Sequence, residues 1–311
     1  MRYSLIIPHY DDPERLERLL RSVPVDRPDL EVLLVDDCSP DQSALDSLKA
    51  RWSMIRWLST TRNSGAAAAR NVGLACAQGE RLVFADSDDE FLFGAFDLFD
   101  QYVGDDDELV YFLAEAVQEV DGSPSKRSEE MNRICRNYFD MPSEATIQSL
   151  MLEHVVPWAK VYSRRLVERV GTRFEEARVA DDVAFNVLTA VQAKHVCAVP
   201  LPVYRVFSRA GSLTKDTTPD AFLERVNVYA RLATAVKPFG LNIPVSGTGW
   251  MLASLSYGPL TAYRVCRVCL GSDLQIDFSR IIQISRWNRF LRKRLIERTE
   301  RRRCRYSGVK K

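Results

Sequence analysis

Short apolar runs alternate with helical patterns through the first half of the chain, and this alternation constrains the fold more than any other feature. Residues 3–8, 30–35 and 81–85 are apolar runs typical of buried strands. Between them, apolar residues recur at helical spacing, as in residues 13–23, where a proline opens the pattern. Strands that alternate with helices form a parallel sheet with helices on its faces. We therefore expect an α/β fold with a mostly parallel, Rossmann-like sheet flanked by helices.

The same patterns predict the remaining elements. Strands are expected at residues 55–59, 108–116, 158–162 and 196–206, and helices at residues 44–52, 65–77, 94–103, 143–154, 164–170, 181–194, 221–236 and 281–303. Two prolines interrupt residues 196–206, which predicts an edge strand or an irregular one. Residues 121–130 are polar and turn-rich, so we expect a loop there. Residues 215–220 (KDTTPD) predict a boundary between a domain at 1–215 and a helical C-terminal region at 216–311.

The charge of the chain is balanced overall but unevenly distributed. The 311 residues include 43 lysines and arginines and 42 aspartates and glutamates, a net charge of +1 that argues against a strongly basic nucleic-acid-binding protein. Residues 279–311 contain 13 basic and two acidic residues, so the rest of the chain is acidic. Residues 280–303 also place apolar side chains near one face, which is typical of a helix at an anionic membrane surface. The alternative is a solvated helix packed on the domain.

Neither a membrane-spanning helix nor a disulfide framework is expected. The longest uncharged stretch, residues 238–263, contains three prolines and four glycines, and residues 1–12 do not resemble a signal peptide. Seven cysteines lie scattered through a chain large enough to fold without disulfides, which indicates reduced thiols in the cytosol. We expect Cys266 and Cys269 to pack on a helix face rather than bind metal, and the three histidines to be structural.

Carboxylates follow three of the expected strands, at the point where each strand ends. In parallel α/β sheets, ligands bind beyond the carboxyl ends of the strands. Clustered carboxylates repel one another unless a cation lies between them, and Mg²⁺ or Mn²⁺ prefers such oxygen ligands. Taken singly, each group could instead be a turn or a helix cap. The clusters follow residues 3–8, 30–35 and 81–85 and consist of Asp11, Asp12, Asp36, Asp37, Asp86, Asp88 and Asp89.

A loop at Asn63, Ser64 and Gly65 precedes an expected helix that contains Arg70. The N-terminus of a helix offers free N–H groups, so this loop suits an anion or a ribose. Arg70 would lie about one turn inside the helix, although a surface salt bridge would also explain it. A metal bound by one or two carboxylates keeps positions free for phosphate oxygens, which makes a nucleoside diphosphate a natural partner.

Four motifs in residues 6–89 resemble those of family 2 glycosyltransferases, which have the GT-A fold. The resemblance continues to about residue 215. The first departure from the family pattern is Asp11, where the family often has asparagine; the second is Asp181 in place of glutamate in its Glu-Asp motif. The matching segments are residues 6–10 (IIPHY), 35–41 (VDDCSPD), 63–65 with 68–73 (NSG, AARNVG), 86–89 (DSDD), 157–162 (PWAKVY), 180–185 (ADDVAF), and 204–205 with 211–214.

The resemblance implies a nucleotide-sugar half at residues 1–105, an acceptor half at residues 106–215, and roles for individual residues. Asp182 would be the general base, with a helix cap as the alternative for the Asp181–Asp182 pair, and Asp86 and Asp88 would bind Mn²⁺ or Mg²⁺. For Trp158, core packing competes with a role beside the sugar. The implied nucleotide-binding residues are Pro8, Tyr10, Asp36, Asp37, Asn63, Arg70 and Asp86, and the implied diphosphate and acceptor residues are Asp181, Trp158, Arg205, Arg209 and Ser212.

The activity implied is an inverting, metal-dependent transfer of a sugar from a nucleotide diphosphate sugar, a UDP-sugar by resemblance, to a hydroxyl of a glycan or lipid-linked glycan. Such an enzyme would take part in surface polysaccharide synthesis, in the cytoplasm and peripherally on the inner face of the membrane. One alternative is a nucleotidyltransferase, although the expected glycine- and basic-rich N-terminal signature is missing. Another is a non-catalytic protein that binds a membrane or RNA, although known RNA-binding signatures are missing.

Overall fold

The computed structural model describes residues 1–209 and 217–277. The chain divides into two compact units, Met1–Asp216 and Thr217–Lys311. Ser212 and the expected basic helix at 281–303 lie outside the described residues.

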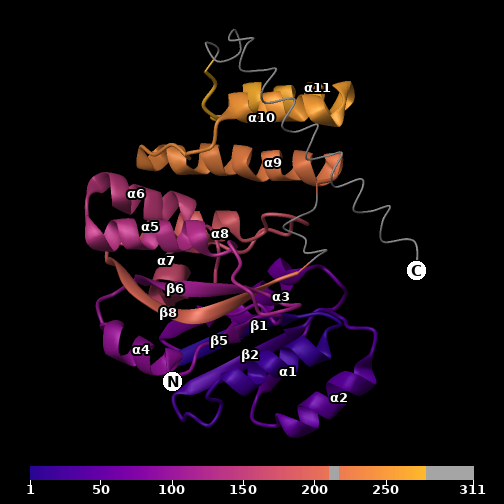
Figure 1. Ribbon diagram of the computed structural model, residues 1–311, viewed down its shortest axis with the longest axis vertical. Helices are drawn as coiled ribbons and strands as arrows, with labels where there is room; N and C mark the ends of the chain where they lie inside the picture. Colours follow the sequence, from indigo (N-terminus) through magenta and orange to yellow (C-terminus); the bar gives the residue numbers. More distant parts are fainter. Residues whose placement is uncertain (210–216, 278–311) are drawn as a thin grey trace. The chain divides into compact units, whose positions relative to one another are not determined.

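The first unit is built on a sheet with the strand order β3-β2-β1-β4-β7-β6-β8-β5 (Figure 1). Among the described residues, six strands run in one direction, and β5 and β7 run against them. The expected α/β fold is therefore confirmed, with a mixed sheet. The strands are β1 (Tyr3–His9), β2 (Leu30–Asp36), β3 (Arg56–Ser59), β4 (Arg81–Phe84), β5 (Glu90–Phe91), β6 (Leu109–Gln118), β7 (Lys160–Ser163) and β8 (Val196–Ser208).

Helices pack on both faces of this sheet (Figure 1). Their bounds are α1 (Pro13–Ser22), α2 (Gln42–Arg51), α3 (Ala66–Cys76), α4 (Ala95–Tyr102), α5 (Glu129–Asp140), α6 (Glu144–Glu153), α7 (Arg164–Val170) and α8 (Val183–Ala190). Helix α5 is missing from the expected elements, and its first two residues lie in the segment expected to be a loop. Its signal was present, because Met131, Ile134, Cys135 and Tyr138 are apolar at helical spacing and pack on the core.

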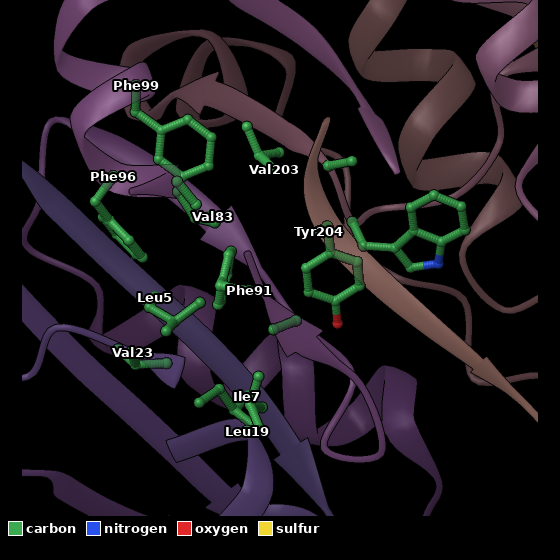
Figure 2. Packing of buried hydrophobic residues seen from close by; sticks show 14 of the residues in the cluster. Leu5, Ile7, Leu19, Val23, Val83, Phe91, Phe96, Phe99, Val203 and Tyr204 are labelled. Carbon is green, nitrogen blue, oxygen red and sulfur yellow. The ribbon is translucent and has the colours of Figure 1, made fainter. Parts of the chain in front are cut away.

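Side chains of β1 alternate between the two faces and join two apolar clusters. Leu5 and Ile7 belong to the cluster that includes Phe96 and Phe99 (Figure 2). Ile6 belongs to the other cluster, on the face that α3 covers. Gly73 of α3 allows this close packing, since a Cβ atom there would come within 2.5 Å of the Ile6 side chain. The contact fixes α3, and with it Arg70, against the sheet.

Strand β8 is irregular, as its prolines predict. It pairs with β6 along most of its length, but the register shifts twice, between Tyr111 and Leu113 and between Leu113 and Ala114. On its other side it pairs only with the two residues of β5, so it lies next to the edge rather than at it. The shifts occur where Pro202 stands opposite Leu113, because proline cannot donate a ladder hydrogen bond.

The described part of the second unit is helical. It consists of α9 (Pro219–Val236), the short 3₁₀ helix η2 (Lys237–Phe239), α10 (Gly247–Ser254), the 3₁₀ helix η3 (Leu255–Tyr257) and α11 (Pro259–Leu270). Cys266 and Cys269 both lie on α11 as free thiols, and Cys269 is buried. Among the helices in residues 1–209 and 217–277, none combines the length and the apolar character needed to cross a bilayer.

Candidate active site

Three carboxylates lie together in the turn after β4. Oxygen atoms of Asp86, Asp88 and Asp89 all fall within 4.8 Å of one another. Asp89 is fully buried; its Oδ1 accepts a hydrogen bond from the Phe207 N–H at 2.9 Å, and its Oδ2 has no hydrogen-bond partner among the described residues. Burial and the neighbouring carboxylates raise the pKa of Asp88 and, far more, that of Asp89. An all-oxygen group of this kind fits Mg²⁺ or Mn²⁺.

Arg70 connects this turn to the turn before α8. It is buried, and its Nη2 lies 2.6 Å from Asp86 Oδ1 while its Nη1 lies 3.2 Å from Asp181 Oδ2. Burial disfavours the charged guanidinium, but the carboxylates of Asp86, Asp181 and Asp182 outweigh it and raise the Arg70 pKa above its ordinary value. The surface salt bridge considered for Arg70 is therefore not what the structure shows. Arg70 is instead a buried cation that pairs with Asp86 and with Asp181, and Asp181 lies 111 positions from it in the chain.

Asp182 occupies the N-cap position of α8 but does not cap the helix with its side chain. Burial is the largest effect on this carboxyl group, and the charge of Asp181 adds to it, so that the Asp182 pKa rises to about 7. A carboxylate with a pKa near neutrality is suited to accept a proton.

Asp36 and Asp37, at the end of β2, each organise a loop. The Asp36 carboxylate accepts hydrogen bonds from the Ser39 backbone and hydroxyl. Asp37 accepts hydrogen bonds from the Ser64 N–H at 3.0 Å, from the Gly65 N–H at 2.6 Å, and from a threonine hydroxyl. Asp37 therefore fixes the loop that contains Asn63, whose side chain is exposed.

Pro8, Tyr10 and Trp158 are further residues that the sequence predicts for the site. Pro8 is buried within β1, and Tyr10, which directly follows β1, is 48% exposed. Trp158 is buried and stacks on Tyr204 with ring centroids 6.0 Å apart, and the Tyr204 hydroxyl accepts a hydrogen bond from the Asp86 N–H at 2.9 Å. This tryptophan therefore packs in the core.

Two predicted arginines form ion pairs in different places. Arg205 pairs with Glu90 at 2.5 Å and with Glu115 at 2.9 Å, both on neighbouring strands of the sheet. Arg209 contacts Asp88 at 3.1 Å and Asp12 at 3.5 Å. The structure thus brings Arg209, but not Arg205, into contact with the carboxylates of the β4 turn.

In residues 1–209 and 217–277, four residues other than glycine have a positive φ, and each lies next to a predicted site residue. They are Asp11 after β1, Cys38 after β2, Ala159 beside Trp158, and Ala180 before Asp181, with φ between 50° and 60°. This conformation is costly for residues with a Cβ atom and is often found at functional sites. Sequence reasoning gives no signal for it, because none of these positions carries a glycine.

Comparisons with known proteins identify the family and the fold. The model of the family "Glycosyl transferase family 2" matches residues 4–171. Poly(ribitol-phosphate) beta-N-acetylglucosaminyltransferase TarS of Staphylococcus aureus is 26% identical over 214 residues, which cover 66% of this chain and 35% of TarS. The chain thus matches about a third of that relative's length.

Two solved structures show the same fold at low sequence identity. The crystal structure of S. aureus TarS 1–349 in complex with UDP-GlcNAc has a TM-score of 0.57 and 22% identity, and the match covers 83% of this chain and 71% of that one. A mannosyltransferase from Pyrobaculum calidifontis, in complex with GDP-Man and Mn²⁺, has a TM-score of 0.52 and 16% identity, with coverages of 87% and 73%.

Proposed function

The chain belongs to glycosyl transferase family 2, and from that premise we propose that it transfers a sugar from a UDP-sugar to an acceptor hydroxyl with inversion at the anomeric carbon. The observation that carries the proposal is the buried Arg70, which joins Asp86 of the carboxylate group to Asp181, the neighbour of Asp182. Arg70 thereby links the carboxylate group, which fits a divalent cation, to the segment that carries the proposed base for the attacking hydroxyl.

Asp86 and Asp88 would hold Mn²⁺ or Mg²⁺, with Asp89 behind them. The fit rests on the three convergent carboxylates and on the buried Asp89 Oδ2 without a hydrogen-bond donor. When bound, such a cation neutralises the negative charge that develops on the diphosphate leaving group. The Mn²⁺ in the mannosyltransferase complex supports a metal in this fold.

Asp182 would remove the proton from the acceptor hydroxyl as the oxygen attacks the anomeric carbon. The positive charge of Arg70 would offset the negative charges of Asp181 and Asp86, since an arginine remains protonated in proteins. Direct attack from the face opposite the leaving group inverts the configuration and needs no covalent enzyme intermediate. Asp37 would hold the loop of residues 63–65 in place for the nucleotide.

For the donor, UDP is favoured because a structure of TarS, a relative of this chain, contains UDP-GlcNAc. For the acceptor, we propose a glycan or lipid-linked glycan of a surface polysaccharide, as the name of TarS describes a poly(ribitol-phosphate) acceptor. The basic residues at 280–303 support a peripheral location on the cytoplasmic face of a membrane. Exchange of Arg289, Arg292, Lys293 and Arg294 for glutamine would then reduce sedimentation of the full chain with anionic vesicles, and unchanged sedimentation would contradict this location.

A calorimetric screen of nucleotide sugars tests the proposed function. The full chain is titrated with UDP-, GDP- and TDP-sugars, each with and without Mn²⁺. We expect a UDP-sugar to bind in a Mn²⁺-dependent manner and UDP to be released when an acceptor is added. If no nucleotide sugar binds under either condition, the proposal is wrong.

A further inference from the structure

A fully buried lysine in the Trp-x-Lys-x-Tyr segment has no part in the proposed chemistry. Lys160 is 0% exposed, and its Nζ donates hydrogen bonds to the His154 carbonyl at 2.6 Å and to Asn186 Oδ1 at 2.9 Å. The Nζ also lies 4.7 Å from the centre of the Tyr111 ring. Within the described residues, no carboxylate forms an ion pair with it. Burial of a lysine without such a partner is costly and lowers its pKa well below the ordinary value, so the position of Lys160 needs an explanation.

The Lys160 contact orients the side chain of Asn186. The Lys160 Nζ donates to the amide oxygen of Asn186, so that oxygen faces the lysine. The Tyr162 hydroxyl donates to the same oxygen at 2.6 Å. With both acceptor positions of Oδ1 occupied, the amide nitrogen points to the opposite side, where Nδ2 donates to the Asp182 carbonyl at 2.8 Å.

Two donors from one residue therefore hold the Asp182 backbone. Besides the side-chain Nδ2, the Asn186 backbone N–H donates to the same Asp182 carbonyl at 3.1 Å. This double contact fixes the peptide group at the start of α8, and thereby the direction in which the Asp182 side chain leaves the backbone. The backbone contact is the first intrahelical hydrogen bond of α8, and the Asn186 side chain adds a second donor to the same carbonyl.

We propose that Lys160 is a positioning residue for the transfer reaction: acting through Asn186, it holds the Asp182 backbone so that the Asp182 carboxylate stays directed at the acceptor hydroxyl. The inference rests on the proposed function, in which Asp182 is the general base. It assigns Lys160 and Asn186 no contact with either substrate.

Two substitutions separate positioning from core packing. Lys160→Met keeps the approximate length of the side chain and removes the donor. Asn186→Asp keeps an oxygen for Lys160, and supplies it with a charge partner, but removes the donor to Asp182. Ile134→Ala, in the buried core cluster that also contains Tyr162, is the control for simple destabilisation. For each variant we would measure turnover, KM, the dissociation constant for UDP with Mn²⁺, and the melting temperature.

We expect Lys160→Met and Asn186→Asp each to lower turnover by about 10- to 100-fold, as displacement of a reacting group does. UDP binding should stay within about two-fold of the unmodified protein, and Ile134→Ala should lower the melting temperature without lowering turnover. The double variant should be no slower than the slower single variant, because both act through one contact. A variant that folds and turns over at the original rate would overturn the inference, as would multiplicative effects in the double variant.

Asn186→Asp alone decides the question if Lys160→Met does not fold. Hydrogen exchange of the amides at residues 183–187 gives a readout that does not depend on activity. Loss of protection there in either variant supports the inference, and unchanged protection in both contradicts it. If the unmodified protein transfers no sugar from any donor, the proposed function fails on its own, while this exchange measurement still tests whether Lys160 holds the Asp182 backbone.

Discussion

The Arg70 guanidinium lies 2.6 Å from the Asp86 carboxylate, inside the protein, and contacts Asp181 with its other terminal nitrogen. Removal of a partner from such a buried pair leaves the remaining charges uncompensated. We therefore predict that Arg70→Met lowers the free energy of unfolding by about 3 kcal/mol at pH 7. Urea denaturation measures this. Arg70→Lys, which keeps the charge, should lose less, and an unchanged urea midpoint for Arg70→Met would contradict the role assigned to this residue.

The pKa of Asp182 predicts how activity depends on pH. Burial, and next the charge of Asp181, raise this pKa to about 7. Only the ionised carboxylate accepts a proton, so turnover should rise with pH and level off above about pH 7. Asp181→Asn removes a negative neighbour, which lowers the Asp182 pKa and moves the rising limb to lower pH. A normalised pH profile of turnover tests this, and a limb that stays in place or moves to higher pH would refute it.

We predict that a metal binds at the three carboxylates after β4, those of Asp86, Asp88 and Asp89. Asp88→Asn should abolish Mn²⁺-dependent binding of UDP, because a neutral amide is a poor ligand for a hard cation. Asp12→Asn is the matched control, since Asp12 also contacts Arg209 but lies outside the group of three carboxylates. Calorimetry with UDP, with and without Mn²⁺, gives both results. Equal loss in the two variants would indicate that Arg209, rather than a metal, accounts for the effect.

The contacts of Asp37 lead to a prediction about nucleotide binding by the loop of residues 63–65. Its carboxylate accepts hydrogen bonds from the Ser64 and Gly65 N–H groups, and an amide in its place would direct hydrogens at one of these donors. Asp37→Asn should weaken UDP binding by about ten-fold, the equivalent of about 1.4 kcal/mol. Asp41→Asn, at the exposed N-cap of α2, should leave UDP binding unchanged. UDP binding at full strength in Asp37→Asn would contradict a role for this loop.

The sequence allowed the strand ends and their carboxylates to be predicted because both are local patterns. An apolar run followed at once by Asp86 or by Asp36 is visible in a few residues, and the motifs at these positions indicated the family. Helix α5 was missed because its first turn looked like the end of a polar loop, although its apolar spacing was readable.

Contacts between distant residues could not be predicted in this way. The partners of Arg70 and the link from Lys160 to Asp182 depend on how α3, β7 and α8 come together, which no local pattern records. Arg205 illustrates a second limit: the register shifts between β6 and β8 change which side chains face each other, so its pairing with Glu115 could not be inferred by counting along the strand.

The most direct test of the account compares binding and transfer in Asp182→Asn. Calorimetry with the UDP-sugar and Mn²⁺ measures binding, and release of UDP in the presence of an acceptor measures transfer. We predict that the variant binds the donor with an affinity within about two-fold of the unmodified protein, while transfer falls by at least about 100-fold, the loss expected for a missing general base. Transfer at the original rate would contradict the account.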